Sequence, residues 1–194
     1  GLAAAAHAVE RGLTPLVFER GNGPGAAMQE WGHVTVFSPW RYNTDAAAER
    51  LLAASGWRAP EPDRLPTGAE IVSDYLAPLA ALPVLAPHLR FGARVTAIAR
   101  QGHDRMTSEG RERAPFVLHW RDAGGGERQS LARAVVDASG TWQQPSPMGT
   151  DGLPVPGERA LEGRLVYGIP DVLGSQRQAY AGRHTLVVGG GHSA

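Results

Sequence analysis

The chain has 194 residues, 42% of them hydrophobic and 20% charged, which is ordinary for a soluble globular protein. Its 19 basic residues are all arginine and balance 19 acidic residues, so no basic excess points to nucleic acid or an anionic membrane. Because lysine and cysteine are absent, these residues form no Schiff base, disulfide, thiolate nucleophile or Cys-ligated metal site.

No apolar run approaches the roughly 18 residues of a membrane span, and the N-terminal residues lack the features of a signal peptide. We therefore expect a cytoplasmic protein without membrane insertion. The sequence does not indicate an oligomeric state. Since no methionine precedes Gly1, we expect further residues in front of it.

The first twenty residues have the order helix, strand, acid. Residues 2–11 are alanine-rich and predict a helix, and residues 14–19 predict a short buried strand. Glu19 follows Gly1 by eighteen residues, close to the interval between the last glycine of a dinucleotide fingerprint and its ribose-binding acid. Alternatively, this is any helix followed by a strand, with Glu19 at a solvated strand end.

Loops and helices are expected to alternate over the next sixty residues. Residues 21–39 are rich in glycine and aromatic residues and predict a loop. Residues 45–55 predict a helix with its N-cap at one of residues 43–45. A second helix should begin after Thr67, which forms a capping-box pattern with the glutamate three residues later. Pro78 should kink or end that helix near the preceding residue.

The following segments predict strands. Residues 89–100 alternate apolar and polar side chains and indicate one half-buried strand. Residues 115–120 and 128–132 predict two more strands, joined by a glycine-rich loop, and residues 134–140 predict another short strand. Three strands in succession within a helix–strand alternation indicate an antiparallel meander inserted between parallel strands.

The last fifty residues combine an irregular segment with a glycine motif. Proline and glycine dominate residues 143–174, which is typical of a connection between domains. The apolar residues 185–188 predict a strand that leads into Gly189, Gly191 and Ala194, spaced as in the turn that receives a dinucleotide pyrophosphate. We expect the rest of that nucleotide-binding domain to follow Ala194.

The order of these features resembles the two-dinucleotide-binding flavoproteins, and among them the flavin-containing monooxygenase-like group. The resemblance implies an α/β fold with a three-layer Rossmann-like FAD-binding domain, an inserted antiparallel β-meander and the start of a second Rossmann-like NAD(P)-binding domain. Residues 1–145 would form the FAD-binding domain, without its first strand and the start of its GxGxxG. Residues 146–182 would be the interdomain connection, and residues 183–194 the first strand and glycine turn of the NAD(P)-binding domain.

The resemblance also implies cofactor-binding positions. Gly1 would face the FAD pyrophosphate, Glu19 would accept hydrogen bonds from the ribose hydroxyls, and Arg20 would cover the adenine, which the backbone of Val95 would also meet. The other implied positions are the Ala-Thr-Gly-like turn Ala138, Ser139 and Gly140, the NAD(P)H pyrophosphate turn Gly189, Gly191, Ser193 and Ala194, and the flavin or substrate side Trp40 and Trp142. Ordinary core or domain packing is the alternative for the two tryptophans.

The implied function is that of an FAD-dependent oxidoreductase that accepts hydride from NAD(P)H and oxidises a small organic substrate as a monooxygenase does. Residues 165–171, however, lack the Phe-x-Gly-x-x-x-His motif usual in that group. A flavin reductase or electron-transfer flavoprotein and a nucleotide-sensing regulatory flavoprotein therefore stay as alternatives. We assign no catalytic residue and expect no metal site, since the histidines lack ligand spacing. We expect residues 1–194 alone to bind FAD poorly and to be inactive.

Overall fold

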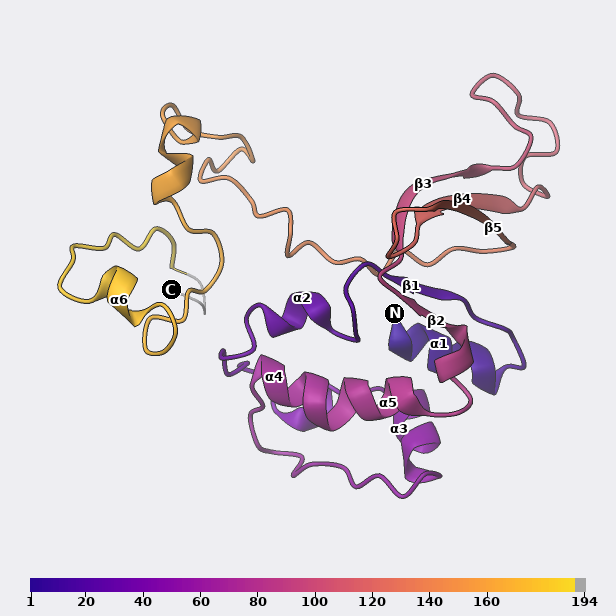
Figure 1. The fold of residues 1–194 in the computed structure, drawn as a ribbon, viewed down its shortest axis with the longest axis horizontal. Coiled ribbons are helices and arrows are strands. Elements are labelled where there is room, and N and C mark those ends of the chain that lie inside the picture. The colour runs from indigo at the N-terminus through magenta and orange to yellow at the C-terminus, as the bar shows by residue number, and fades with distance from the viewer. Residues whose placement is uncertain (191–194) are drawn as a thin grey trace.

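The computed structural model describes residues 1–190 and shows a mixed α/β fold with two small sheets (Figure 1). β1 (Val17–Glu19) and β2 (Leu89–Phe91) form a parallel pair. β3 (Arg94–Arg100), β4 (Phe116–Arg121) and β5 (Glu127–Ala132) form an antiparallel sheet in the order in which they follow in the chain. The predicted meander is therefore confirmed. No helix among the described residues is long and apolar enough to cross a membrane.

The hydrophobic core lies between the helices of the first 85 residues. α1 (Leu2–Glu10) packs against α3 (Ala46–Ala53), and both helices bury alanines that allow a close approach. Arg50 donates to both carboxylate oxygens of Glu10, at 2.8 and 2.7 Å, and so links the two helices at their exposed edge. The buried cluster consists of Ala5, Ala6, Trp40, Ala47, Ala48, Leu52, Ile71, Tyr75, Leu79, Leu82 and Leu85.

Asp45, which is one of the three predicted candidates, is the N-cap of α3. Its Oδ1 accepts from the backbone N–H groups of Ala47 and Ala48, at 3.0 and 3.1 Å, and its Oδ2 lies 3.0 Å from Nε2 of His7. Burial raises the pKa of the Asp45 carboxyl, but these hydrogen bonds and the charge of His7 outweigh it and leave the pKa lowered. The cap therefore ties the start of α3 to α1.

The second predicted helix begins with the expected capping box. The Thr67 side chain accepts from the backbone of Glu70, and the Glu70 carboxylate accepts from the backbone of Thr67. The helix then runs through α4 (Gly68–Ile71), a π-helical turn (Val72–Leu76) and α5 (Ala77–Ala81). The predicted end near Ala77 is wrong, because the helix continues past Pro78 to Ala81; the irregularity is the π-helical turn that comes just before Ala77.

Pro78 accounts for part of this irregularity. Because proline has no N–H, it cannot donate to the carbonyl four residues earlier, which is that of Asp74. The indole Nε1 of Trp57 donates to that carbonyl instead, at 2.7 Å. A side chain from the preceding proline-rich segment thus satisfies a backbone group that the helix leaves open.

The prediction of one half-buried strand over residues 89–100 is wrong. The chain turns at Gly92, whose φ of 65° suits glycine, and residues on either side belong to different sheets. Before the turn, β2 pairs in parallel with β1. After the turn, β3 pairs with β4 and contains a bulge between Val95 and Ala97. Most of β3 is exposed, since little chain covers the meander.

Two predicted strands are not formed. Residues 134–140 and 185–188 have extended or irregular backbone and pair with no other described strand. A strand requires a neighbour for its backbone hydrogen bonds, and the short apolar pattern alone does not supply one. Their aliphatic side chains lie in the open, with Val136 at 72% and Leu186 at 86% exposure.

Short helical segments complete the described chain. The predicted loop at residues 21–39 contains a single helical turn, and the proline-rich connection contains two turns, drawn in orange and yellow in Figure 1. These and the remaining short helices are α2 (Ala26–Gln29), Trp40–Tyr42, Ala86–His88, Arg159–Arg164 and α6 (Arg177–Tyr180).

Candidate functional site

The candidate site lies where α1 begins and β1 ends. Gly1 precedes α1 without a side-chain cap, which leaves first-turn N–H groups open for an anion. A Cβ atom built on Gly1 would lie 4.0 Å from Cγ1 of Val17, so the helix start lies against β1. Val17 and Glu19 belong to the same short strand, so the start of α1 lies against the strand that ends at Glu19.

Glu19 is held by the turn that follows β1. Its Oε1 accepts from the backbone N–H of Gly21 at 2.7 Å, which fixes the orientation of the carboxylate. No hydrogen bond joins the other oxygen, Oε2, to another residue from 1 to 190, and the side chain is half-buried. The predicted role of Glu19 at a ribose stays a prediction.

The neighbouring strand brings Val95 to the same edge. The backbone N–H of Ala93 donates to the Glu19 carbonyl at 2.9 Å, so the chain passes the end of β1 before Val95 pairs with Trp120. The Trp120 ring in turn lies 5.1 Å from that of Phe18, which packs the meander against β1. These contacts place the start of β3 beside Glu19.

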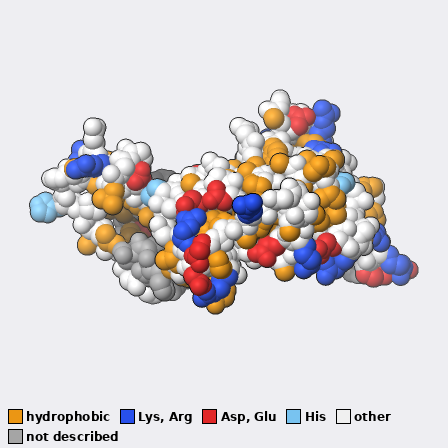
Figure 2. All heavy atoms as spheres, turned by 90° about the horizontal axis from the view of Figure 1, so that it is seen from below, with side chains coloured by type: hydrophobic (Ala, Val, Ile, Leu, Met, Phe, Trp, Pro, Cys, Tyr) orange, Lys and Arg blue, Asp and Glu red, His pale blue; other side chains and the backbone are white. Residues whose placement is uncertain are grey.

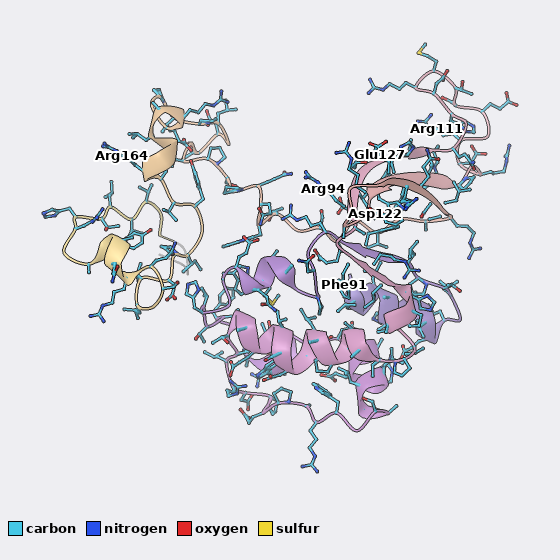
Figure 3. All side chains as sticks on the ribbon, viewed as in Figure 1. Phe91, Arg94, Arg111, Asp122, Glu127 and Arg164 are labelled. Carbon is cyan, nitrogen blue, oxygen red and sulfur yellow. The ribbon has the colours of Figure 1, made fainter. Side chains whose placement is uncertain are left out.

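Charged side chains surround the junction of the two sheets. Figure 3 shows Phe91 at the end of β2, with Arg94 next to the β4–β5 hairpin that carries Asp122 and Glu127. Arg121, which pairs with Arg94 in the sheet, forms an ion pair with Glu127 at 3.0 Å. On the face drawn in Figure 2, arginine and acidic side chains are interspersed.

Arg20 follows Glu19 and is exposed. Its side chain forms no ion pair or hydrogen bond with another residue in the described part of the chain. Its guanidinium is therefore free to stack on a planar ring, as arginine does on aromatic surfaces. This is the disposition expected of a residue that covers an adenine.

Trp40 does not lie at this edge but in the core, with 1% of its surface exposed. Its indole Nε1 has no hydrogen-bond partner among the described residues. The guanidinium of Arg64 lies over the ring, 5.9 Å from its centroid. The surroundings of Trp40 are thus those of a packing residue.

The predicted Ala-Thr-Gly-like turn is exposed. Oδ1 of Asp137 accepts from the backbone N–H of Ser139 at 3.0 Å and from its hydroxyl at 2.7 Å. These bonds close the chain into a local turn over Ala138, Ser139 and Gly140 in place of the predicted strand end. The open surface of this turn leaves its backbone accessible.

Trp142 contacts a segment far away in the sequence. Its Nε1 donates to Oε2 of Glu30 at 2.8 Å, across 112 positions, and its ring lies 6.2 Å from that of Trp31. Sequence reasoning missed Glu30 and Trp31, because one sequence carries no signal for a contact between such distant segments. The one local signal in the sequence was the adjacent pair Glu30 and Trp31 within the glycine-rich loop of residues 21–39.

The second glycine motif is described only in part. Gly189 is exposed and lies in irregular chain, whereas Gly191, Ser193 and Ala194 lie outside the described residues. The predicted cradle for NAD(P)H therefore stays a prediction. Among residues 1–190, no three His, Cys, Asp or Glu side chains form a group that could hold a metal ion.

Comparisons with known proteins add no family to this picture. No protein-family model matches the chain, and no curated protein matches it either.

Proposed function

We propose that the protein is an FAD-dependent oxidoreductase that accepts hydride from NAD(P)H. The observation that carries the proposal is the position of Glu19 at the carboxyl end of a strand in a parallel pair, with the uncapped N-terminus of α1 packed against that strand. In dinucleotide-binding folds the pyrophosphate binds at such a helix start, and the ribose binds at such an acid. The meander that follows β2 supports an FAD-binding domain over residues 1–145.

Each residue of the candidate site has a role in this proposal. The N–H groups at the start of α1 bind the pyrophosphate, and Gly1 leaves the phosphate oxygens room to approach. Oε2 of Glu19 accepts from the ribose hydroxyls while Gly21 holds Oε1. Arg20 covers the adenine face. Bound FAD would supply the hydride-accepting chemistry, and the protein supplies placement and charge.

The second nucleotide would bind at the chain's other end. We assign residues 183–194 to the start of an NAD(P)-binding domain, in which Gly189, Gly191 and Ser193 receive the NAD(P)H pyrophosphate. Residues 146–182 would connect the two domains. Bound NAD(P)H would supply the hydride that reduces FAD. In a monooxygenase-like reaction O2 would be the oxidant of the small organic substrate, with one oxygen atom entering the product and the other leaving as water.

A reductase without oxygenation is the second candidate. Tyr167 and Gly168 occupy the region where monooxygenases of the resembling group carry their Phe-x-Gly-x-x-x-His motif, and both contribute to packing. Tyr167 donates to Glu158, and Gly168 lies against Trp142. Oxygen uptake that yields only hydrogen peroxide, without an oxygenated product, would select this candidate over a monooxygenase.

Purification tests whether FAD is the cofactor. Protein expressed from the complete gene and purified in the dark is expected to be yellow and to release about one FAD per chain on denaturation, because the site holds both phosphate and ribose. Thin-layer or liquid chromatography of the released flavin distinguishes FAD from FMN. Colourless protein that also fails to take up added FAD would rule out the proposal.

A further inference from the structure

A pair of tryptophans joins the C-terminal segment to the helical part of the molecule. Trp31 lies in the turn after α2, and Trp142 lies where the chain leaves the two sheets. Their ring centroids are 6.2 Å apart, with the planes inclined by 55°. In Figure 1 the chain beyond this point runs past α2 into the separate orange and yellow part.

The backbone of a glycine packs against each of the two tryptophan rings. A Cβ atom on Gly68, the first residue of α4, would lie 2.7 Å from the Trp31 ring, and one on Gly168 would lie 2.8 Å from the Trp142 ring. Real Cβ atoms do not approach that closely, so both indoles rest directly on backbone. Gly68, Trp31, Trp142 and Gly168 therefore form one continuous series of contacts from the helical core to the C-terminal segment.

Glu30 fixes the pair in this arrangement. One of its carboxylate oxygens accepts from Nε1 of Trp142 at 2.8 Å, and the other accepts from Nε2 of Gln143 at 2.7 Å. Hydrogen bonds to an ionised acceptor are stronger than those between neutral groups. One side chain thus holds two consecutive residues of the segment.

A buried carboxylate holds the Gly168 end of this series of contacts. Glu158 is 4% exposed and accepts from the backbone N–H of Val155 at 2.8 Å, from that of Met148, and from the hydroxyl of Tyr167. The bond from Tyr167 lowers the pKa of this carboxyl. Because Tyr167 precedes Gly168, Glu158 positions the backbone on which Trp142 rests.

We propose that Glu30, Trp31, Trp142 and Gly168 form a latch that fixes residues 143–190 to the helical part of the chain and that can open without unfolding that part. The buried core cluster extends only from Ala5 to Leu85 and includes no residue of the segment. Opening the latch therefore frees the segment from the helical part, so that its backbone can move into a protease, and leaves the core packed. If the proposed function holds, the latch also sets the position of the second glycine turn, which begins at Gly189.

The test is to open the latch by adding one methyl group. Gly168→Ala, at a φ of 96°, places a Cβ against the Trp142 ring, whereas Gly182→Ala, at a φ of 72°, meets nothing within 4 Å. The second variant is a matched control, because it shares the positive φ and the segment but lacks the contact. Trp142→Phe removes the indole N–H and part of the ring without backbone strain.

Two measurements on the whole protein report the latch. Relative to Gly182→Ala, we expect Gly168→Ala and Trp142→Phe to raise the rate of tryptic cleavage after Arg164 and Arg177 by about fivefold or more. Near-ultraviolet circular dichroism of Gly168→Ala should lose the coupled tryptophan signal, while the far-ultraviolet spectrum of the helices is kept. Cleavage rates of Gly168→Ala and Trp142→Phe equal to that of Gly182→Ala, or a tryptophan signal unchanged in Gly168→Ala, would overturn the latch.

Discussion

Trp40→Ala is expected to lower the free energy of unfolding by about 3–5 kcal/mol, which is the usual cost of removing a large aromatic side chain from a core. Trp40 is 1% exposed and belongs to the buried cluster between α1, α3 and α5. The loss combines the transfer of apolar surface back to water with the cavity left behind. Urea denaturation followed by circular dichroism measures the change.

Two further variants separate packing from other roles of Trp40. Tyr42→Ala removes a 71% exposed aromatic ring from the same short helix and should change stability by about 0.5 kcal/mol or less. Trp40→Phe should cost much less than Trp40→Ala, because it keeps most of the ring and deletes an indole N–H that has no hydrogen-bond partner among residues 1–190. Equal effects of Trp40→Ala and Tyr42→Ala would contradict the core position.

Glu19→Ala is expected to weaken FAD binding about ten- to a hundredfold, since hydrogen bonds to a charged group contribute about 1.5–3 kcal/mol. The variant removes the acceptor that we assign to the ribose hydroxyls. It also frees the N–H of Gly21, which now holds the carboxylate in place. Flavin fluorescence titration of the apoprotein gives the dissociation constants.

The controls for Glu19 test charge and position separately. Glu19→Gln keeps an acceptor oxygen and should fall between the wild type and Glu19→Ala. Glu109→Ala removes an acid from the exposed loop between β3 and β4 and should bind FAD like the wild type. An unchanged dissociation constant in Glu19→Ala, with the thermal stability of the wild type, would exclude this carboxylate from the site.

Local chemistry explains which parts of the fold could be predicted from the sequence. The Asp45 cap and the Thr67–Glu70 capping box depend on residues two or three positions apart, and both form as expected. The meander could also be predicted, because its strands follow one another and pair with their sequence neighbours. In each case the interacting groups belong to one element or to elements that follow each other in the chain.

Features that depend on distant neighbours could not be predicted in this way. The apolar residues 134–140 and 185–188 look like strands, yet no described strand lies beside them to accept their hydrogen bonds. The split at Gly92 follows from the need to change from one sheet to another, which alternation alone does not reveal.

The same distinction between local and distant contacts applies to the residues of the candidate site. The interval between Gly1 and Glu19 could be read from the sequence, and the structure places the start of α1 against β1, the strand that ends at Glu19. For Trp40 the sequence left cofactor contact and core packing as alternatives, and the structure places the residue in the core. The partner of Trp142 lies 112 positions away and could not be read from the sequence.

Anaerobic reduction by a nicotinamide nucleotide tests the central proposal most directly. Protein expressed from the complete gene is mixed with NADPH, and separately with NADH, under argon while the flavin absorbance is followed. We expect at least one of the two nucleotides to bleach the bound flavin stoichiometrically, with recovery of the yellow colour when oxygen is admitted. Bound flavin that neither nucleotide reduces faster than free FAD would contradict an NAD(P)H-dependent oxidoreductase.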